Sequence, residues 1–190
     1  FNGEVDKTGD SDTMKTFGAN LGYKLEEGEW QFDLGAGWLN NLGNSNTLRD
    51  HIATTSTTVA GFTEALALHA NLQHGGWSIM AEYIAALDSF QPGEINFTGR
   101  GARPKAWQLE LAYTTEVAER EVTLALGYQG TAETVALGLP EHRYLGSIGI
   151  GIFAKTTLTL EYRHDQDYDI AQGGTDENAH QVVAQLAVEF

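Results

Sequence analysis

Four arginines in this sequence, Arg100, Arg103, Arg143 and Arg163, have the chemistry to bind a charged small molecule. A guanidinium group is planar and stays protonated, so it can hold a carboxylate through two parallel hydrogen bonds. Arg143 and Arg163 fall in segments that alternate polar and apolar residues. Arg100 and Arg103 lie in a loop-like stretch that precedes another alternating segment. A cluster of these four side chains predicts a site for an anionic, carboxylate-rich solute.

Carboxylates on the same side of the alternation give the arginines a second, structural role. Glu110 and Glu161 share the polar side with Arg143 and Arg163, and further acids occur in the adjoining loops. Salt bridges among them would hold neighbouring segments together without any solute. Rings of carboxylates favour cations and rings of arginines favour anions, so both sets are candidate solute-binding residues. Pairing is the simpler of the two interpretations, and both stay open.

The acidic stretch Asp165–Asp169 resembles a calcium loop only superficially. The calcium-binding pattern needs Gly at its sixth position and Glu at its twelfth, and counting from Asp165 these positions hold Ile170 and Asp176. We therefore expect a solvated acidic loop and no metal. A weak divalent-ion bridge to lipopolysaccharide is the alternative.

Hydrolase chemistry finds equally little support. His164 stands beside Asp165 and so imitates an Asp–His pair, and His142 and His180 also lie near the long-loop ends of their predicted strands. His164, however, has the parity of the apolar side, and no Gly-x-Ser-x-Gly motif is present; Ser147 is the one serine in these segments flanked by glycine. We therefore expect no enzymatic activity and no cofactor.

The elements that must position these residues are β-strands. Apolar and polar residues alternate over most of the chain, the period of a strand with one apolar face, whereas helical periodicity is rare. Nine apolar faces follow one another: Phe17–Tyr23, Trp30–Trp38, Leu66–Leu72, Trp77–Tyr83, Trp107–Tyr113, Val122–Tyr128, Tyr144–Ile152, Leu158–Tyr162 and Val182–Phe190. Each strand is roughly 9–12 residues long, the length that crosses a bilayer at a tilt. The alternation assigns Asp33, His69, Glu82, Glu110, Glu161, Arg163 and Glu189 to the opposite, polar side.

The connections between the strands alternate in length. Short ones are expected at Leu25–Glu29, Gln73–Gly76, Val117–Arg120 and Ala154–Lys155, and long ones at Asn41–Gly61, Asp88–Pro104, Thr131–Glu141 and Asp165–Asn178. Aromatic residues lie at both ends of the apolar faces, with aliphatic residues between them. Together these features predict an all-β, transmembrane antiparallel up-and-down β-barrel of the bacterial outer membrane, a single domain over residues 1–190. A soluble β-sandwich also alternates, but its second face should be charged, and here that face is mostly small or uncharged.

Composition excludes several other classes of protein. The chain has 26 Asp and Glu against 11 Lys and Arg, and a formal charge of −15 repels phosphate, so no nucleic-acid partner is expected. The absence of cysteine excludes a disulfide scaffold, a zinc finger and a catalytic thiol. No stretch of roughly 18 apolar residues occurs, and with a mean hydropathy of −0.28 a transmembrane helix is excluded.

The two ends of the sequence bear on how much of a barrel it contains. Phe190, with apolar residues at alternate positions back to Val182, resembles the C-terminal signal that the barrel-insertion machinery reads. If Phe190 is periplasmic, Met14–Lys24 is the first full strand, Lys7–Asp12 is an extracellular loop and Phe1–Asp6 is the tip of another strand. Bacterial barrels have an even number of strands, so we expect upstream strands and a C-terminal portion of a larger barrel here.

Several runs of sequence are more specific than alternation. They are Gly101–Pro104 leading into Trp107–Glu110, Ala125–Thr131, Ala136–Pro140, Arg143–Leu145, Leu158–Asp165 and Gln185–Phe190. In these runs the chain resembles the siderophore-porin family typified by the legiobactin-uptake receptor of legionellae, whose members are considerably longer. The resemblance implies an outer-membrane channel for ferric siderophore, but it implies no binding residues because the family has no diagnostic ligand motif. Outer-membrane lipid, lipopolysaccharide and the insertion machinery are then the expected partners, and a homo-oligomer is left open. The alternative is a structural barrel with a plugged lumen that binds a partner.

Overall fold

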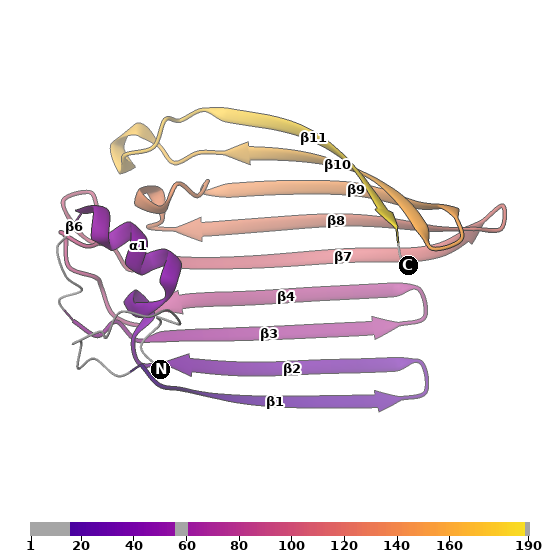
Figure 1. Cartoon of the computed structure of the whole chain (residues 1–190), viewed down its shortest axis with the longest axis horizontal. Coiled ribbons are helices and arrows are strands. Elements are labelled where there is room, and N and C mark those ends of the chain that lie inside the picture. The colour runs from indigo at the N-terminus through magenta and orange to yellow at the C-terminus, as the bar shows by residue number, and fades with distance from the viewer. Residues whose placement is uncertain (1–15, 56–60, 189–190) are drawn as a thin grey trace.

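A single antiparallel sheet dominates the structure, a computed structural model that describes residues 16–55 and 61–188. Within these residues the nine long strands of the sheet are β1 (Gly18–Glu27), β2 (Trp30–Leu39), β3 (Ala65–His74), β4 (Trp77–Ala86), β7 (Lys105–Val117), β8 (Arg120–Ala132), β9 (His142–Phe153), β10 (Thr156–Gln166) and β11 (Asn178–Val188). Strands that follow one another in sequence lie side by side in the sheet (Figure 1). The predicted all-β, up-and-down arrangement is confirmed.

Several predicted features fall partly or wholly outside the described residues. The strand tip Phe1–Asp6, the loop Lys7–Asp12, Glu189 and Phe190 all lie outside them. The predicted first strand, Met14–Lys24, begins at Gly18 in the described part and continues past Lys24 to Glu27.

Three of the four short connections are tighter than predicted because the strands continue into them, whereas Ala154–Lys155 has the predicted length. The β1–β2 turn contains Gly28 at φ 61°, the β3–β4 turn contains Gly75 at φ 55°, and Ala118 and Glu119 between β7 and β8 have φ values of 50° and 63°. Positive φ values in a two-residue turn match the right-handed twist of the flanking strands. These turns lie at one end of the sheet, together with the end of β11 (Figure 1).

The long connections gather at the opposite end of the sheet and contain folded elements that the alternation did not predict (Figure 1). The first contains the 3-10 helix η1 (Leu42–Asn44) and the helix α1 (Asn46–Thr55), and the second contains a small hairpin of β5 (Asn96–Phe97) and β6 (Arg100–Gly101). The third and fourth contain η2 (Val135–Leu137) and η3 (Ile170–Gln172). In the part of the chain that is described, α1 included, no helix has the length and apolar character needed to cross a membrane.

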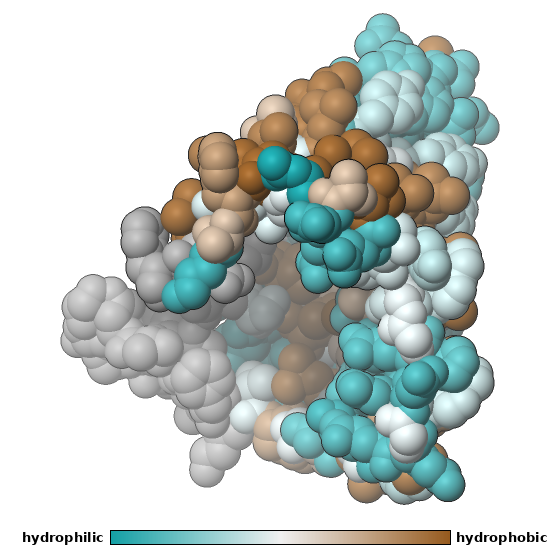
Figure 2. Space-filling model, turned by 90° about the vertical axis from the view of Figure 1, so that its right-hand side faces the viewer, coloured by the Kyte–Doolittle hydropathy of each residue, from teal (hydrophilic) through white to brown (hydrophobic). Residues whose placement is uncertain are grey.

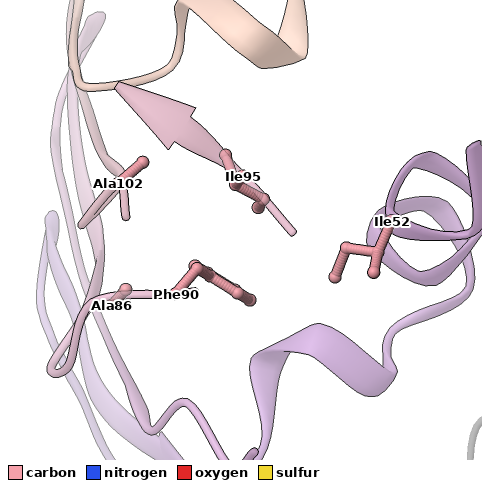
Figure 3. Packing of buried hydrophobic residues seen from close by; sticks show 5 residues of the cluster. All are labelled: Ile52, Ala86, Phe90, Ile95 and Ala102. Carbon is pink, nitrogen blue, oxygen red and sulfur yellow. The ribbon is translucent and has the colours of Figure 1, made fainter. Parts of the chain in front are cut away.

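The buried apolar cluster lies among these loops rather than within the sheet. Ile52 of α1, Phe90 and Ile95 of the second loop, Ala102 just after β6 and Ala86 at the end of β4 are each at most 3% exposed (Figure 3). Ala86 has the same parity in β4 as Glu82, so the loops pack onto the polar face of the sheet at this end.

Much of the apolar face of the sheet is exposed, although Ala85 near the loops is buried. Leu21 of β1, Leu126 of β8 and Phe153 of β9 are 78%, 67% and 75% exposed. A soluble monomer rarely exposes a contiguous apolar surface of this kind. This face therefore needs a covering that the described residues do not supply.

The sheet is open in the described residues, because β1 pairs only with β2 and β11 only with β10. Each residue of these two edge strands is exposed. Seen from the end with the short turns, the molecule is hollowed in the middle (Figure 2).

Candidate functional site

One register row of polar side chains crosses the polar face of the sheet from β3 to β10. In strand order its members, here called the polar row, are His69, Glu82, Gln108, Gln129, Arg143 and Asp165. Directly paired residues of antiparallel strands have Cβ atoms about 4.5–5.5 Å apart, so their side chains can interact along the row. Gln108 Nε2 donates to Glu82 Oε2 at 2.6 Å, and Gln129 Nε2 donates to Gln108 Oε1 at 3.1 Å.

On β2 the polar row ends at a glycine. Gly35 pairs with His69, and a Cβ added at Gly35 would come within 2.1 Å of the imidazole ring. The missing side chain lets the His69 ring lie over β2, where Nε2 is 3.3 Å from Asp33 Oδ1. Asp33, His69 and Glu82 thus lie on the side that the alternation predicts.

At the other end of the row, Asp165 contacts two arginines. Arg143 donates from Nε to Oδ1 at 2.7 Å and from Nη2 to Oδ2 at 2.9 Å. Arg163 lies on the same face, with Nε 3.5 Å from Asp165 Oδ2, and this buried Nε makes no hydrogen bond within the described residues. Asp165 is therefore held by two hydrogen bonds from Arg143 and by a longer ion pair with Arg163.

The remaining two arginines surround a different carboxylate, that of Glu133. Arg100 donates to both oxygens of Glu133, at 3.0 and 2.7 Å, and lies over the Phe97 ring at 5.3 Å. The backbone N–H of Arg103 donates to Glu133 Oε2 at 2.7 Å, and Arg103 Nε donates to the Ala86 carbonyl at 3.1 Å. Burial raises the pKa of Glu133, but the hydrogen bonds from Arg100 and Arg103 outweigh it and hold the pKa below its ordinary value.

The four arginines therefore form two groups, each around one carboxylate, instead of a single cluster. Neither Glu110 nor Glu161 is the partner acid. Glu110 shares a register row with Arg163 but is separated from it by β8 and β9, about 14 Å by strand spacing. Glu161 pairs in register with Ser147 on the same face. Asp165, which the sequence placed in a loop, is the strand residue that contacts Arg143 and Arg163.

A cavity of about 440 Å³ lies over the polar row beneath the third long loop. Its lining includes the row members His69, Glu82, Gln108, Gln129 and Arg143, together with Ala67, Ile84, Ala106, Thr131, Leu139 and Pro140. Small-molecule sites have volumes of roughly 300–1,000 Å³ and combine apolar walls with a few polar groups. The alternation put Gln108 and Gln129 on this face but gave no reason to prefer them as site residues; their direct pairing across β7 and β8 was the missing information.

The acidic fourth loop is organised by hydrogen bonds to its own chain. Asp167 accepts hydrogen bonds from the Thr175 hydroxyl at 2.6 Å, from the Thr175 backbone N–H at 2.8 Å and from the Tyr168 backbone N–H at 2.8 Å. These bonds, led by that of the Thr175 hydroxyl, hold the pKa of Asp167 below its ordinary value. Among the described residues no group of three His, Asp or Glu side chains could hold a metal ion.

The residues that imitated a hydrolase site are split between the two faces. His164 follows Tyr162 on the apolar face, whereas Asp165 and Ser147 lie on the polar face. His164 instead contacts His180, with the two Nδ1 atoms 3.2 Å apart.

Comparison with known proteins gives relatives but no functional name. The chain is similar to UPF0422 proteins. The one from Legionella pneumophila strain Philadelphia 1 is 31% identical over 201 residues, which cover 91% of this chain and 38% of the relative. The one from Coxiella burnetii strain RSA 493 is 32% identical over 173 residues, which cover 90% and 37%. The chain thus spans about two fifths of the length of these curated relatives.

Neither a family model nor a solved structure matches the chain. The names of the UPF0422 relatives mention no siderophore, channel or membrane. The siderophore-porin resemblance therefore stays a prediction.

Proposed function

We propose that this chain is part of an outer-membrane β-barrel channel that admits a small solute. The observation that carries the proposal is the contrast between the two faces of one curved sheet. One face is apolar and exposed, while the other presents the polar row and a cavity. A bilayer around a water-filled lumen is the environment that suits both faces at once.

Aromatic pairs support the placement of this sheet in a bilayer. Trp77 and Tyr113 lie 4.5 Å apart at the short-turn end of the apolar face, and Phe17 and Trp38 lie 5.6 Å apart at the long-loop end. Amphipathic rings prefer the two lipid–water interfaces, and the residues between these ends are mostly aliphatic. Outer-membrane lipid and lipopolysaccharide are the partners that this face would contact.

The proposed cargo is a ferric siderophore, which follows from the sequence resemblance. The polar row supplies both hydrogen-bond donors and acceptors to the cavity, and Arg143 and Arg163 on the same face supply positive charge. Anionic, carboxylate-rich chelates are the solutes that such guanidinium groups hold best. Passage needs no enzymatic step and no cofactor in this proposal.

Closure of the barrel is part of the same proposal. The exposed edges β1 and β11 present unpaired backbone groups, which cannot face lipid without a hydrogen-bonding partner. Strands contributed by the rest of the full-length protein, or by a second copy in a homo-oligomer, would pair with these edges.

A structural barrel with a plugged lumen is the second candidate, and one observation favours it. The long loops are packed together around Ile52, Phe90 and Ile95 and lie on the polar face at one end. A packed layer in this position narrows or closes the entrance to the lumen.

Planar-bilayer conductance of the full-length protein separates the two candidates. A stable open channel is expected for transport, and its selectivity should respond to ferric siderophore added on the loop side. A protein that shows heat-modifiable gel mobility but no conductance under any condition would support the structural barrel and overturn the channel.

A further inference from the structure

Two imidazoles and a phenol converge on the apolar face at the long-loop end of β10 and β11. His164 and His180 are register partners on these adjacent strands. Their rings stack with centroids 4.5 Å apart, and their Nδ1 atoms are 3.2 Å apart. Tyr162, two residues before His164 on the same face, places its hydroxyl 2.7 Å from His180 Nδ1.

Hydrogen bonding alone does not satisfy this arrangement. The Nδ1 atom of a neutral imidazole carries either one hydrogen or one lone pair, so it makes one good hydrogen bond. His180 Nδ1, however, lies within hydrogen-bonding distance of both Tyr162 Oη and His164 Nδ1. The two contacts must share a single lone pair or a single hydrogen, and a bound cation would resolve this conflict.

The spacing of the two nitrogens is that of two ligands of one metal ion. With metal–nitrogen distances of about 2.0–2.1 Å, two imidazole nitrogens at tetrahedral to square-planar angles are about 2.9–3.4 Å apart. The observed 3.2 Å lies within that interval. The rings are nearly parallel, at 23°, so a turn of each ring about χ2, a broad and soft torsion in histidine, is needed to point both lone pairs at one ion.

We propose that His164 and His180 form a binding site for a divalent transition-metal ion, with Tyr162 or water completing the coordination. Imidazole is a preferred ligand of Zn²⁺, Cu²⁺ and Ni²⁺. The paired strands fix the spacing of the two residues, and the Tyr144 ring stacks against His164 at 6.0 Å. This inference does not depend on the proposed transport function.

The same face offers a matched control residue. His142 of β9 also lies near a tyrosine, with Nδ1 3.0 Å from the Tyr128 hydroxyl. Its hydrogen bond joins one imidazole to one phenol, so it has the local chemistry of the proposed site without the second nitrogen.

The test uses Cu²⁺ as the probe and full-length protein purified through a tag that contains no histidine. Cu²⁺ titration and electron paramagnetic resonance are expected to show a site with two nitrogen ligands. His164→Gln and His180→Gln should each weaken binding at least about tenfold and leave one nitrogen, whereas His142→Gln should change neither readout. Equal affinity in the wild type and the His164→Gln/His180→Gln double variant, or an equal loss in His142→Gln, would overturn the proposal.

A second measurement requires no variant of the pair. Zn²⁺ should protect His164 and His180 of the wild-type protein from modification by diethyl pyrocarbonate while His142 stays reactive, as read by peptide mass spectrometry. Modification of His164 and His180 at the same rate with and without Zn²⁺ would also overturn the proposal.

Discussion

The hydroxyl of Tyr168 lies 2.7 Å from the hydroxyl of Thr131, which joins the fourth long loop to the end of β8. Tyr168 is 1% exposed, and its hydroxyl is also 3.1 Å from Thr134 Oγ1. Its ring meets that of Phe97 edge-on at 6.4 Å, so one side chain connects the second, third and fourth loops. Thr131 also lines the cavity over the polar row. The stability of the loop layer and the shape of the cavity are therefore linked through Tyr168.

Tyr168→Phe should destabilise the loop layer by about 1–2 kcal/mol, because it removes one hydrogen-bonding group and leaves the hydroxyls of half-buried Thr131 and buried Thr134 with one partner fewer. Tyr168→Ala should cost about 3–5 kcal/mol, since it also empties a buried ring site. Hydrogen exchange of the third and fourth loops measures both effects. Tyr144→Phe on the exposed apolar face is the control. Equal effects of the two Tyr→Phe substitutions would contradict the proposed role of Tyr168 in connecting the loops.

Acid should release the second loop through Glu133. The pKa of Glu133 in the folded protein is lower than its ordinary value of 4.5, so its contribution to stability is complete above that value. The contribution is lost as the pH falls through the folded-state pKa. Limited proteolysis within residues 88–104 should accelerate in that acidic range.

Glu133→Gln is the matched control for the acid response, because it keeps the shape of the side chain and removes its titration. Its second loop should be cleaved faster than that of the wild type at neutral pH, with little further change on acidification. If the Glu133→Gln protein shows the same acid-dependent step as the wild type, another group controls the loop.

Alternation was sufficient to predict the strands of the sheet, because a strand with two different faces repeats every two residues. It placed Asp33 and Glu82 on the polar face and His164 on the apolar face without any knowledge of the fold. The partners within a face depend on register between strands, which the pattern of one strand does not contain. The sequence left Glu110, Glu161 and acids of the adjoining loops open as partners, so it could not single out Asp165 as the partner of Arg143.

The loop layer was the part of the structure that periodicity could not predict. Ile52 and Phe90 are separated widely in sequence and become neighbours only when two loops pack onto the end of β4. The helix α1 around Ile52 is short, and its burial depends on this long-range contact and not on a repeating pattern within its own sequence.

Ile52→Asp should open the loop layer at the mouth of the proposed lumen. Burying an unpaired carboxylate in place of an isoleucine is unfavourable, so α1 should detach from Phe90 and Ile95. Trypsin cleavage after Arg49 should become faster, and the single-channel conductance of the full-length protein should rise. Ala53→Asp, which adds the same charge at an exposed neighbouring position, is the control. Faster cleavage with unchanged conductance would show that α1 does not restrict the channel.

Arg143 and Arg163 should set the charge preference of the lumen, because together with Asp165 they form a group with one net positive charge. Arg143→Gln removes both strong hydrogen bonds to Asp165 and should cost about 1–3 kcal/mol of stability. Arg163→Gln should cost less, since the Nε of Arg163 forms only a longer ion pair with Asp165, yet it removes a positive charge from the same face. The double variant converts the net charge of the group from positive to negative, so the anion-to-cation permeability ratio from reversal potentials should fall, and uptake of ferric siderophore should fall with it.

Arg120→Gln is the matched control, because Arg120 lies at the short-turn end of β8, where it donates to backbone carbonyls of β9 far from the cavity. Unchanged selectivity and uptake in the double variant, or an equal change in Arg120→Gln, would limit Arg143 and Arg163 to holding the wall of the sheet together.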